Sequence, residues 1–472
     1  MTGIRRLGQA CAIACALSLA GGAQAMSLSE AIAAAYESNP DLLAARANLR
    51  AADEAVNQAR AGLRPRVDGA VSYGAQRTDG RGRPADSTDA FRAGLDATQP
   101  LYDGGRTQNT VRARIANVSA ARARLAALEQ NVTLDVVNAY LDILAEQEFV
   151  RLAQNNVRVI SEQLRAAQDR FEVGEVTRTD VSQAQARLAE ANANLIVTQG
   201  RLDRARQAFV RVVGAEPRNL TQPTVTPPLP GSMSDAVTMA LENHPLSIAA
   251  RFDEAAASRD IRARIGELLP TVSLGASADY GDSVFDSGRR LPGGGRSGAD
   301  RDTSLSVNLR AAIPLYQGGA EYSRVREAQA RASAARAELT TTARERQNLA
   351  EAAWTELQVA RANIRANRER VAAATLAFEG VREEANVGAR TTLDVLDAEQ
   401  EVLDASVRLV ASVRDEFIAA YSLLSATGGL TTAALDIPVD VYDPDVNFDA
   451  NAARFIGFER TEDTVWEELW RP

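Results

Sequence analysis

Few side chains of this sequence could carry out chemistry on a substrate. The chain of 472 residues contains one histidine, His244, and two cysteines, Cys11 and Cys15. With one histidine and no cysteine after position 15, a zinc site built from His and Cys is excluded, and a His-based triad has no supporting residues nearby in sequence. The sequence therefore predicts a protein that is not an enzyme, with no cofactor and no metal.

Two other local patterns have structural interpretations. Gly293 to Gly298 matches the G-x-G-x-x-G pattern, but it stands between two expected strands and opens no helix, which a nucleotide site requires. His244 precedes Pro245 as Asn39 precedes Pro40, and we expect both to cap a helix break before proline. The glycine run is therefore interpreted as a loop and the histidine as structural.

The chain is duplicated. Three short motifs recur, the first at an offset of 205 positions and the others at 214: Asn39-Pro40 as His244-Pro245, Pro100-Leu101-Tyr102 as Pro314-Leu315-Tyr316, and Val173-Gly174 as Val387-Gly388. A period near 200 residues is too long for a solenoid repeat and indicates two copies of one half-molecule. The nine extra residues fall between Pro270 and Pro314, so the segments downstream are expected to match in length.

The first 25 residues predict a secretory signal peptide. Arg5 and Arg6 precede an apolar run from Ala10 to Ala20, and Ala23-Gln24-Ala25 is a small-residue cleavage site. Met26 follows, so no cysteine stands there for lipid attachment. The formal net charge of -9 argues against nucleic acid as a partner, because such proteins usually carry a basic face.

Four segments alternate apolar with small or polar residues over about ten positions, the length of a tilted membrane β-strand. They predict two hairpins, at residues 66–99 and 271–313. Residues 78–89 and 282–302 are rich in Gly, Asp, Arg and Ser and are expected to form outer loops. The apolar faces contain Val67, Gly69, Val71, Tyr73 and Ala75; Phe91, Ala93, Leu95 and Ala97; Val272, Leu274, Ala276, Ala278 and Tyr280; and Leu305, Val307, Leu309, Ala311 and Ile313.

Four strands alone cannot close a barrel. Alternation by itself leaves open two half-buried hairpins of a soluble protein. In lipid, however, an open sheet edge is not tolerated, so a membrane protein of this kind needs strands from several chains. Three copies would supply twelve strands, an even number within the known range.

Two proline-free stretches, residues 104–172 and 318–385, predict helices of roughly 100 Å each at 1.5 Å per residue. A returning helix follows each, at residues 178–214 and 391–427. The first returning helix has one row at 3-4 spacing: Val181, Ala184, Leu188, Ala191, Leu195, Thr198, Leu202, Ala205 and Phe209. The second has two adjacent rows: Val395, Ala398, Val402, Ala405 and Leu409, and Leu396, Leu403, Val410, Phe417 and Leu424. Two rows are typical of a helix with neighbours on both flanks.

This organisation divides the chain into a signal peptide at 1–25, a first structural repeat at 26–222, a linker at 223–231, a second repeat at 232–430 and an acidic tail at 431–472. The expected fold class is an α+β membrane protein. It consists mostly of long α-helices forming a helical barrel, with four transmembrane β-strands per chain and a trimer that closes a twelve-stranded β-barrel.

The duplication, the paired hairpins, the paired long helices and the Val-Gly turns together resemble the TolC family of outer-membrane channel-tunnels. The most specific match is the segment from Val387 to Ala398, VGARTTLDVLDA. The resemblance implies a homotrimer whose barrel lies in outer-membrane lipid and whose helical tunnel projects into the periplasm. It also implies an exit duct for efflux of small molecules or type I protein secretion, with a periplasmic adaptor protein and an inner-membrane pump or ABC exporter as partners.

The resemblance implies a gated entrance at the helical turns. Asp394 and Asp397 would each form a ring of three carboxylates that favours cations. The alternative is that they are solvated aspartates favoured at a helix start. Arg390, Thr179 and Asp180 would make the contacts that hold the entrance shut.

Two further features belong to the same turns. Val173-Gly174-Glu175 and Val387-Gly388-Ala389 would dock the adaptor, although a glycine there also ends a helix. Ala385 stands where some members carry a gate tyrosine, so the lock is expected to be looser or to use other residues.

Two alternatives that are not channels remain open. A trimeric coiled-coil adhesin would have contiguous strands at its carboxyl end, whereas the two hairpins here are separated by a long helical segment. A soluble periplasmic scaffold would explain the helices and leave the alternation of the strands unexplained. The sequence does not identify the transported substrate or the role of the tail, which contains Trp466 and Trp470.

Overall fold

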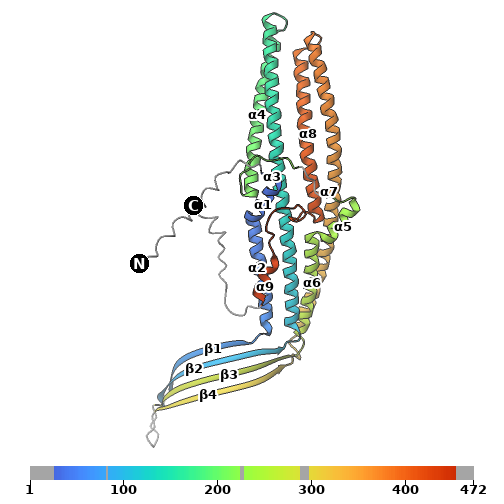
Figure 1. Ribbon diagram of the computed structural model, residues 1–472. Coiled ribbons are helices and arrows are strands. Elements are labelled where there is room, and N and C mark those ends of the chain that lie inside the picture. Colours follow the sequence, from blue (N-terminus) through green and yellow to red (C-terminus); the bar gives the residue numbers. More distant parts are fainter. Residues whose placement is uncertain (1–25, 81–82, 224–227, 288–296, 453–472) are drawn as a thin grey trace, which may run out of the picture. The chain divides into compact units, whose positions relative to one another are not determined.

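The structure is a computed structural model that describes residues 26–80, 83–223, 228–287 and 297–452 (Figure 1). The expected signal peptide, most of the glycine run and the two tail tryptophans lie outside the described residues. The chain separates into two compact units. The first unit comprises the chain up to Arg46, Ala123–Ile248 and Thr342–Tyr442, and the second comprises Ala47–Arg122, Ala249–Thr341 and the chain from Asp443.

The two halves of the chain form the same α-helices and strands in the same order, and the first half adds one short 3-10 helix. The first half contains α1 (Leu28–Ser38), α2 (Pro40–Arg60), the short 3-10 helix Ala61–Leu63, β1 (Arg66–Gly80), β2 (Arg83–Tyr102), α3 (Arg106–Glu172) and α4 (Arg178–Val213). The second half contains α5 (Met233–Asn243), α6 (Pro245–Gly266), β3 (Thr271–Ser287), β4 (Ser297–Ala312), α7 (Ala320–Asn386) and α8 (Thr392–Thr427). A last helix, α9 (Pro444–Ala452), follows.

The long helices match in length, as the constant sequence offset predicts. α3 and α7 each have 67 residues, and α4 and α8 each have 36. Every boundary of the second pair lies 214 positions after its counterpart in the first pair. Each returning helix starts at a threonine capping box and ends at a left-handed glycine, Gly214 or Gly428. The same local signals therefore fix both hairpins.

The four strands form one antiparallel sheet in the order β1-β2-β3-β4, within the second unit. Its register aligns the apolar residues of neighbouring strands in rows, for example Val67, Ala97, Ala276 and Val307. The predicted alternation is therefore confirmed across the sheet, and all these residues share what we call the apolar face. Val71 is 75% exposed and Leu305 81% exposed in the single chain, so nothing in the described chain covers this face.

The strands are longer than the sequence predicts. β1, β2, β3 and β4 have 15, 20, 17 and 16 residues, so most of residues 78–89 and 282–302, expected as loops, continue the ladder. The apolar alternation still covers only about ten positions of each. The prediction of loops was wrong because backbone N–H and C=O groups can pair beyond the point where side chains become polar. Polarity marks where the surroundings of the strand change, not where the strand ends.

Tyr140 and Phe209 are fully buried at the centre of the largest core cluster, in the first unit. The Tyr140 hydroxyl accepts a hydrogen bond from the Thr221 amide at 3.0 Å. Part of the acidic tail packs against this core through Leu435, Ile437, Val439 and Tyr442. The tail is therefore an integral part of the fold as far as Tyr442, which the sequence did not indicate.

Helix α9 is held within the second unit by polar and aromatic contacts. Asp445 forms an ion pair with Arg122 at 2.5 Å, and the Asn447 amide donates to the buried Asp53 at 2.8 Å. The Phe448 ring lies 5.4 Å from the Arg122 guanidinium and 5.8 Å from that of Arg60, both within cation–π range. Among the described residues, no helix has the length and hydrophobicity needed to cross a bilayer.

The capping role expected for His244 is confirmed. Its Nδ1 accepts from the Leu246 amide at 3.1 Å, as Asn39 Oδ1 accepts from the Asp41 amide at 3.0 Å in the first half. His244 is only 5% exposed, and burial, aided by the nearby Arg346, lowers its pKa from 6.5 to about 4. The folded protein therefore holds this imidazole neutral.

The buried histidine predicts a pH-dependent loss of stability. Because the unfolded chain protonates His244 below pH 6.5 and the folded chain does so near pH 4, stability is full above 6.5 and falls as pH drops toward 4. The loss is on the order of 3 kcal/mol. His244→Asn keeps the acceptor and removes the titration. Melting temperatures of the two proteins in detergent should therefore agree near pH 7 and diverge toward pH 4.5, with the variant more stable. Parallel curves would contradict this assignment.

Candidate functional site

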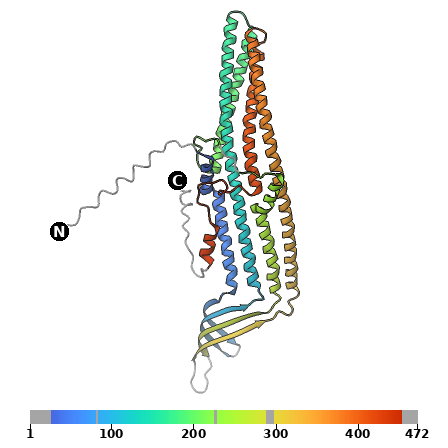
Figure 2. The ribbon, with the colours of Figure 1, turned by 45° about the vertical axis from the view of Figure 1, so that its right-hand side comes forward.

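The two helical hairpins of the first unit end in turns of the same geometry (Figures 1 and 2). At the first turn, Gly174 has φ of 82° and the Glu175 amide donates to the Arg170 carbonyl at 2.9 Å. At the second, Gly388 has φ of 78° and the Ala389 amide donates to the Glu384 carbonyl at 2.8 Å. These are Schellman ends, in which only glycine takes the left-handed conformation at low cost.

Each turn presents an apolar side chain to the surroundings. Val173 is 72% exposed and Val387 is 81% exposed. No side chain or backbone atom lies within 4 Å of where a Cβ of Gly174 or Gly388 would stand, so the glycines serve the backbone conformation and not close packing. The two valines therefore form matching projections, one on each hairpin.

Asp394 lies in the first turn of α8 and closes a capping box. Its Oδ2 accepts from the Thr391 amide at 2.9 Å and from the Thr391 hydroxyl at 2.8 Å. These hydrogen bonds, backbone first, lower the pKa of Asp394, with a contribution from Arg390. Asp180 makes the same contacts with Thr177 in the first half, and they lower its pKa as well. Both carboxylates therefore stay charged well below neutral pH.

Asp397 makes a contact of a different kind, between the two hairpins. Its Oδ1 accepts from Nη2 of Arg187, on α4, at 2.8 Å. Arg187 also bonds Glu190 on its own helix at 3.2 Å. The counterpart of Asp397 in the first half is Gln183, so this ion pair occurs only once in the repeat.

Arg390 and Thr179 do not meet within this chain. Arg390 Nε donates to Glu384 at 2.8 Å, beside the same turn, and Glu384 raises the pKa of Arg390. Thr179 is exposed on the first turn of α4. A second cross-hairpin contact is made by Arg170 of α3, whose Nη2 donates to the Ala385 carbonyl at 3.3 Å. Ala385 itself is buried.

A small apolar cluster supports these polar contacts. Ile160 of α3, Ala184 and Ala191 of α4 and Leu396 of α8 are buried together, with Leu188 packed against them. Leu396 and Asp397 are adjacent, so the packing of one positions the other beside Arg187. The predicted rows on α4 and α8 are confirmed, because each of their residues is buried or half-buried.

Sequence reasoning missed Arg187 and Arg170. Arg187 forms an ordinary i,i+3 pair with Glu190, and nothing in the sequence marks its second partner 210 positions away. Arg170 bonds a backbone carbonyl, a partner that no residue type reveals. Only the three-dimensional packing of the hairpins brings these groups together.

Comparisons with known proteins agree with this architecture. A family model described as outer membrane efflux protein matches residues 31–215 and 236–429, one match for each repeat. The chain is 35% identical to the outer membrane efflux protein BepC of Brucella suis over 92% of both chains, and 27% identical to the outer membrane protein TolC of Vibrio cholerae over 88% of this chain and 93% of that one.

A solved structure of CusC, 19% identical, has the same fold, with a TM-score of 0.75 over 85% of this chain and 92% of that chain. These relatives are channel proteins and not enzymes. The chain therefore belongs to the outer membrane efflux protein family, and it is an outer-membrane channel-tunnel for efflux or secretion whose tunnel lies in the periplasm.

Proposed function

We propose that three copies of the chain close one twelve-stranded barrel in the outer membrane and that the two hairpin turns of each copy form a gated periplasmic entrance. The observation that supports the barrel is the sheet: four strands, an exposed apolar face, and unpaired edges at β1 and β4. In lipid an unpaired edge costs several kcal/mol per backbone group. Edge-to-edge pairing of three copies removes every edge. The family assignment disfavours the adhesin and the scaffold.

The entrance is closed by weak contacts between the hairpins of each chain. Arg187 with Asp397 and Arg170 with the Ala385 carbonyl link the α3–α4 hairpin to the α7–α8 hairpin. An exposed ion pair is worth roughly 0.2–1 kcal/mol. Contacts of this strength would let the entrance open without a large energy input. Ala385 stands where some relatives carry a tyrosine that helps to hold the entrance closed. Arg390, Thr179 and Asp180 would add contacts only between neighbouring hairpins of the trimer.

Two carboxylate rings and the six tips complete the entrance. Asp394 and Asp397 give two rings of three charges that favour cations. Two aspartates at this spacing occur only in the second repeat, because the first repeat has Asp180 followed by Gln183. The exposed valines and glycines of the turns, at 173–175 and 387–389, form the docking points for a periplasmic adaptor. The adaptor would connect the channel to an inner-membrane pump or ABC exporter, which selects the transported molecule.

The ring proposal predicts a change in ion selectivity. Asp394→Asn should lower the cation-to-anion permeability ratio in planar bilayers roughly sevenfold for each kT of lost local potential energy, because cations and anions respond in opposite directions by about threefold each. Because hydrogen bonds lower the pKa of Asp394, the wild-type preference should persist at mildly acid pH. Asp203→Asn removes a carboxylate that pairs with Arg206 on its own helix, well after the turn, and serves as the control. Equal selectivity in Asp394→Asn and wild type would remove Asp394 from the filter.

The proposed contacts between the two hairpins of each chain predict a change in conductance. Arg187→Gln removes the pair with Asp397 and should shift each chain toward the open entrance by up to about fivefold, which corresponds to about 1 kcal/mol. Single-channel recording should therefore show larger or more frequent openings. The matched control is Arg206→Gln, because Arg206 pairs with Asp203 on its own helix at 3.2 Å. A conductance equal to that of the control would exclude Arg187 from the gate.

A further inference from the structure

A pocket of about 540 Å³ lies within the first unit, close to the point where α8 ends and α6 begins. This volume is within the range of pockets that hold drug-sized molecules. Its lining comes from α3, the start of α6, α7 and α8, and combines small and apolar residues with a few polar ones. None of the lining residues takes part in the contacts at the hairpin turns.

The pocket lies on a third face of α8. On one face of this helix, Tyr421 packs into the largest core cluster, which also contains residues of α1. On another face, Leu423 packs into a smaller cluster with Ala236 of α5. The polar lining residues of α8 belong to neither cluster, and their spacing of seven and three positions keeps them on one side of a helix. They are Asp415, Ser422 and Ser425.

One end of the pocket presents hydrogen-bond donors. His244 accepts from the Leu246 amide through Nδ1, so the neutral ring carries its hydrogen on Nε2, for which the described residues supply no acceptor. Arg346 lies near enough for its charge to help lower the pKa of His244. The Nε of Arg346 is buried without a hydrogen-bond partner in the described chain. Buried donors are normally paired, and a bound acceptor would pair these two.

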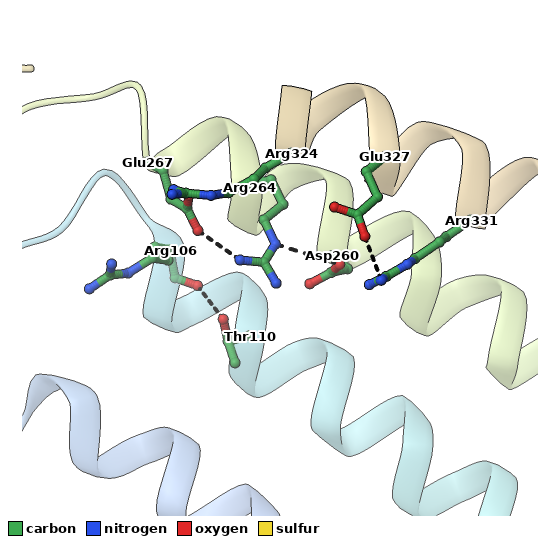
Figure 3. Close-up of polar contacts among 8 residues, drawn as sticks. All are labelled: Arg106, Thr110, Asp260, Arg264, Glu267, Arg324, Glu327 and Arg331. Carbon is green, nitrogen blue, oxygen red and sulfur yellow. Dashed lines mark hydrogen bonds and ion pairs between the residues drawn. The ribbon is translucent and has the colours of Figure 1, made fainter. Parts of the chain in front are cut away.

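Arg346 differs in this respect from other arginines of α6 and α7. Arg324 and Arg264 share the carboxylate of Glu267, each at 2.9 Å (Figure 3). Arg370 bonds a carboxylate of α8 at 2.6 Å. Arg346 is half-buried, yet it forms no ion pair with any residue that the structure describes. Its charge is therefore available to a ligand.

The other end of the pocket presents carboxylates. Glu356 follows Arg346 by ten positions on α7, which is about 15 Å along the helix. Asp415 lies farther in the same direction, because its neighbour Glu416 pairs with Arg361 of α7 at 3.3 Å. Both carboxylates of the lining are exposed. The wall between the two ends is apolar and includes Leu349, Ala352 and Ala353.

We propose that this pocket binds small zwitterionic organic molecules, with the carboxylate at Arg346 and the Nε2–H of His244, the ammonium at Glu356 and Asp415, and an apolar body between them. A guanidinium and an imidazole N–H both donate to carboxylate oxygens, and the hydrogen bonds to the charged group are the stronger ones. A molecule with only one of the two charges leaves one end of the pocket unpaired, so the pocket discriminates against it.

The pocket gives the channel a binding site for molecules in transit. This part of the inference rests on the proposed tunnel. Helices α1 and α5 have 11 residues each, too few to form part of a wall of long helices, so they cover that wall from outside. The third face of α8, which packs against neither, then faces the interior of the tunnel.

Calorimetric titration of the full-length channel in detergent tests the pocket. The probe is a biphenyl with a carboxyl group on one ring and an aminomethyl group at the far end of the other. It should bind once per chain. Biphenylmethylamine, which lacks the carboxylate, should bind about tenfold more weakly or worse, because it loses a hydrogen bond to a charged group. Biphenylcarboxylic acid should also bind more weakly than the zwitterion. Equal affinity of all three probes would overturn the proposal.

Substitutions locate the site. Arg346→Gln should weaken binding of the zwitterion about tenfold. Arg344→Gln removes an exposed charge of the same helix outside the lining, and this control should bind like wild type. Ala352→Phe fills the pocket from an exposed position and should abolish binding, which provides a second test if Arg346→Gln fails to assemble. Unchanged binding in either assembled pocket variant would refute the assignment.

Single-channel recording separates the binding site from the channel. Only assemblies that conduct before the probe is added are scored, so a failure to assemble counts against the proposed function and not against the pocket. The zwitterion should interrupt the current reversibly in wild type and Arg344→Gln, and the interruptions should be about tenfold shorter in Arg346→Gln, because weaker binding mostly appears as faster dissociation. Binding in the calorimeter without interruptions of the current would refute the role in transit.

Discussion

The unpaired backbone groups at the two edges of the sheet are the constraint on which the rest of the molecule depends. β1 and β4 are the edges of a sheet whose apolar face is exposed, so the sheet is incomplete as a single chain in either water or lipid. In the proposed trimer, further copies would close these edges and fix a common axis. Two hairpins per copy would then surround that axis, and the equal lengths of α3 and α7 suit tips that reach one level.

The sheet and the hairpin turns are held together by interactions of very different strength. In the sheet, each strand pairs along its whole length, and opening the barrel would expose many backbone groups at once. At the tips, a few exposed polar contacts and a small cluster around Leu396 hold the hairpins together. The proposed gate requires this difference, because the sheet would remain sealed against lipid while the tips open.

Much of this architecture could be predicted because local sequence patterns determine it. The period-2 rows of the strands, the 3-4 rows of α4 and α8, and the offset of 214 positions all reappear in the structure. Strand lengths could not be predicted, since ladder pairing continues where side chains turn polar. The contacts of Arg187 and Arg170 were equally hidden, because their partners are distant in sequence or are backbone atoms. The register slip of β2 between Pro100 and Tyr102 was signalled only by Pro100, because proline within an inner strand is typical of a bulge.

The most direct test of the account is a disulfide between the two sheet edges. Val71 of β1 and Thr303 of β4 share a row, yet two strands lie between them, about 14 Å, so no bond can form within one chain. With Val71→Cys fixed and the second cysteine moved through Thr303, Leu305 and Val307, oxidation should yield a covalent species that stops at three chains, while each single-cysteine variant stays monomeric in denaturing gels. Monomers at every position, or a ladder that continues beyond three chains, would contradict the closed trimeric barrel.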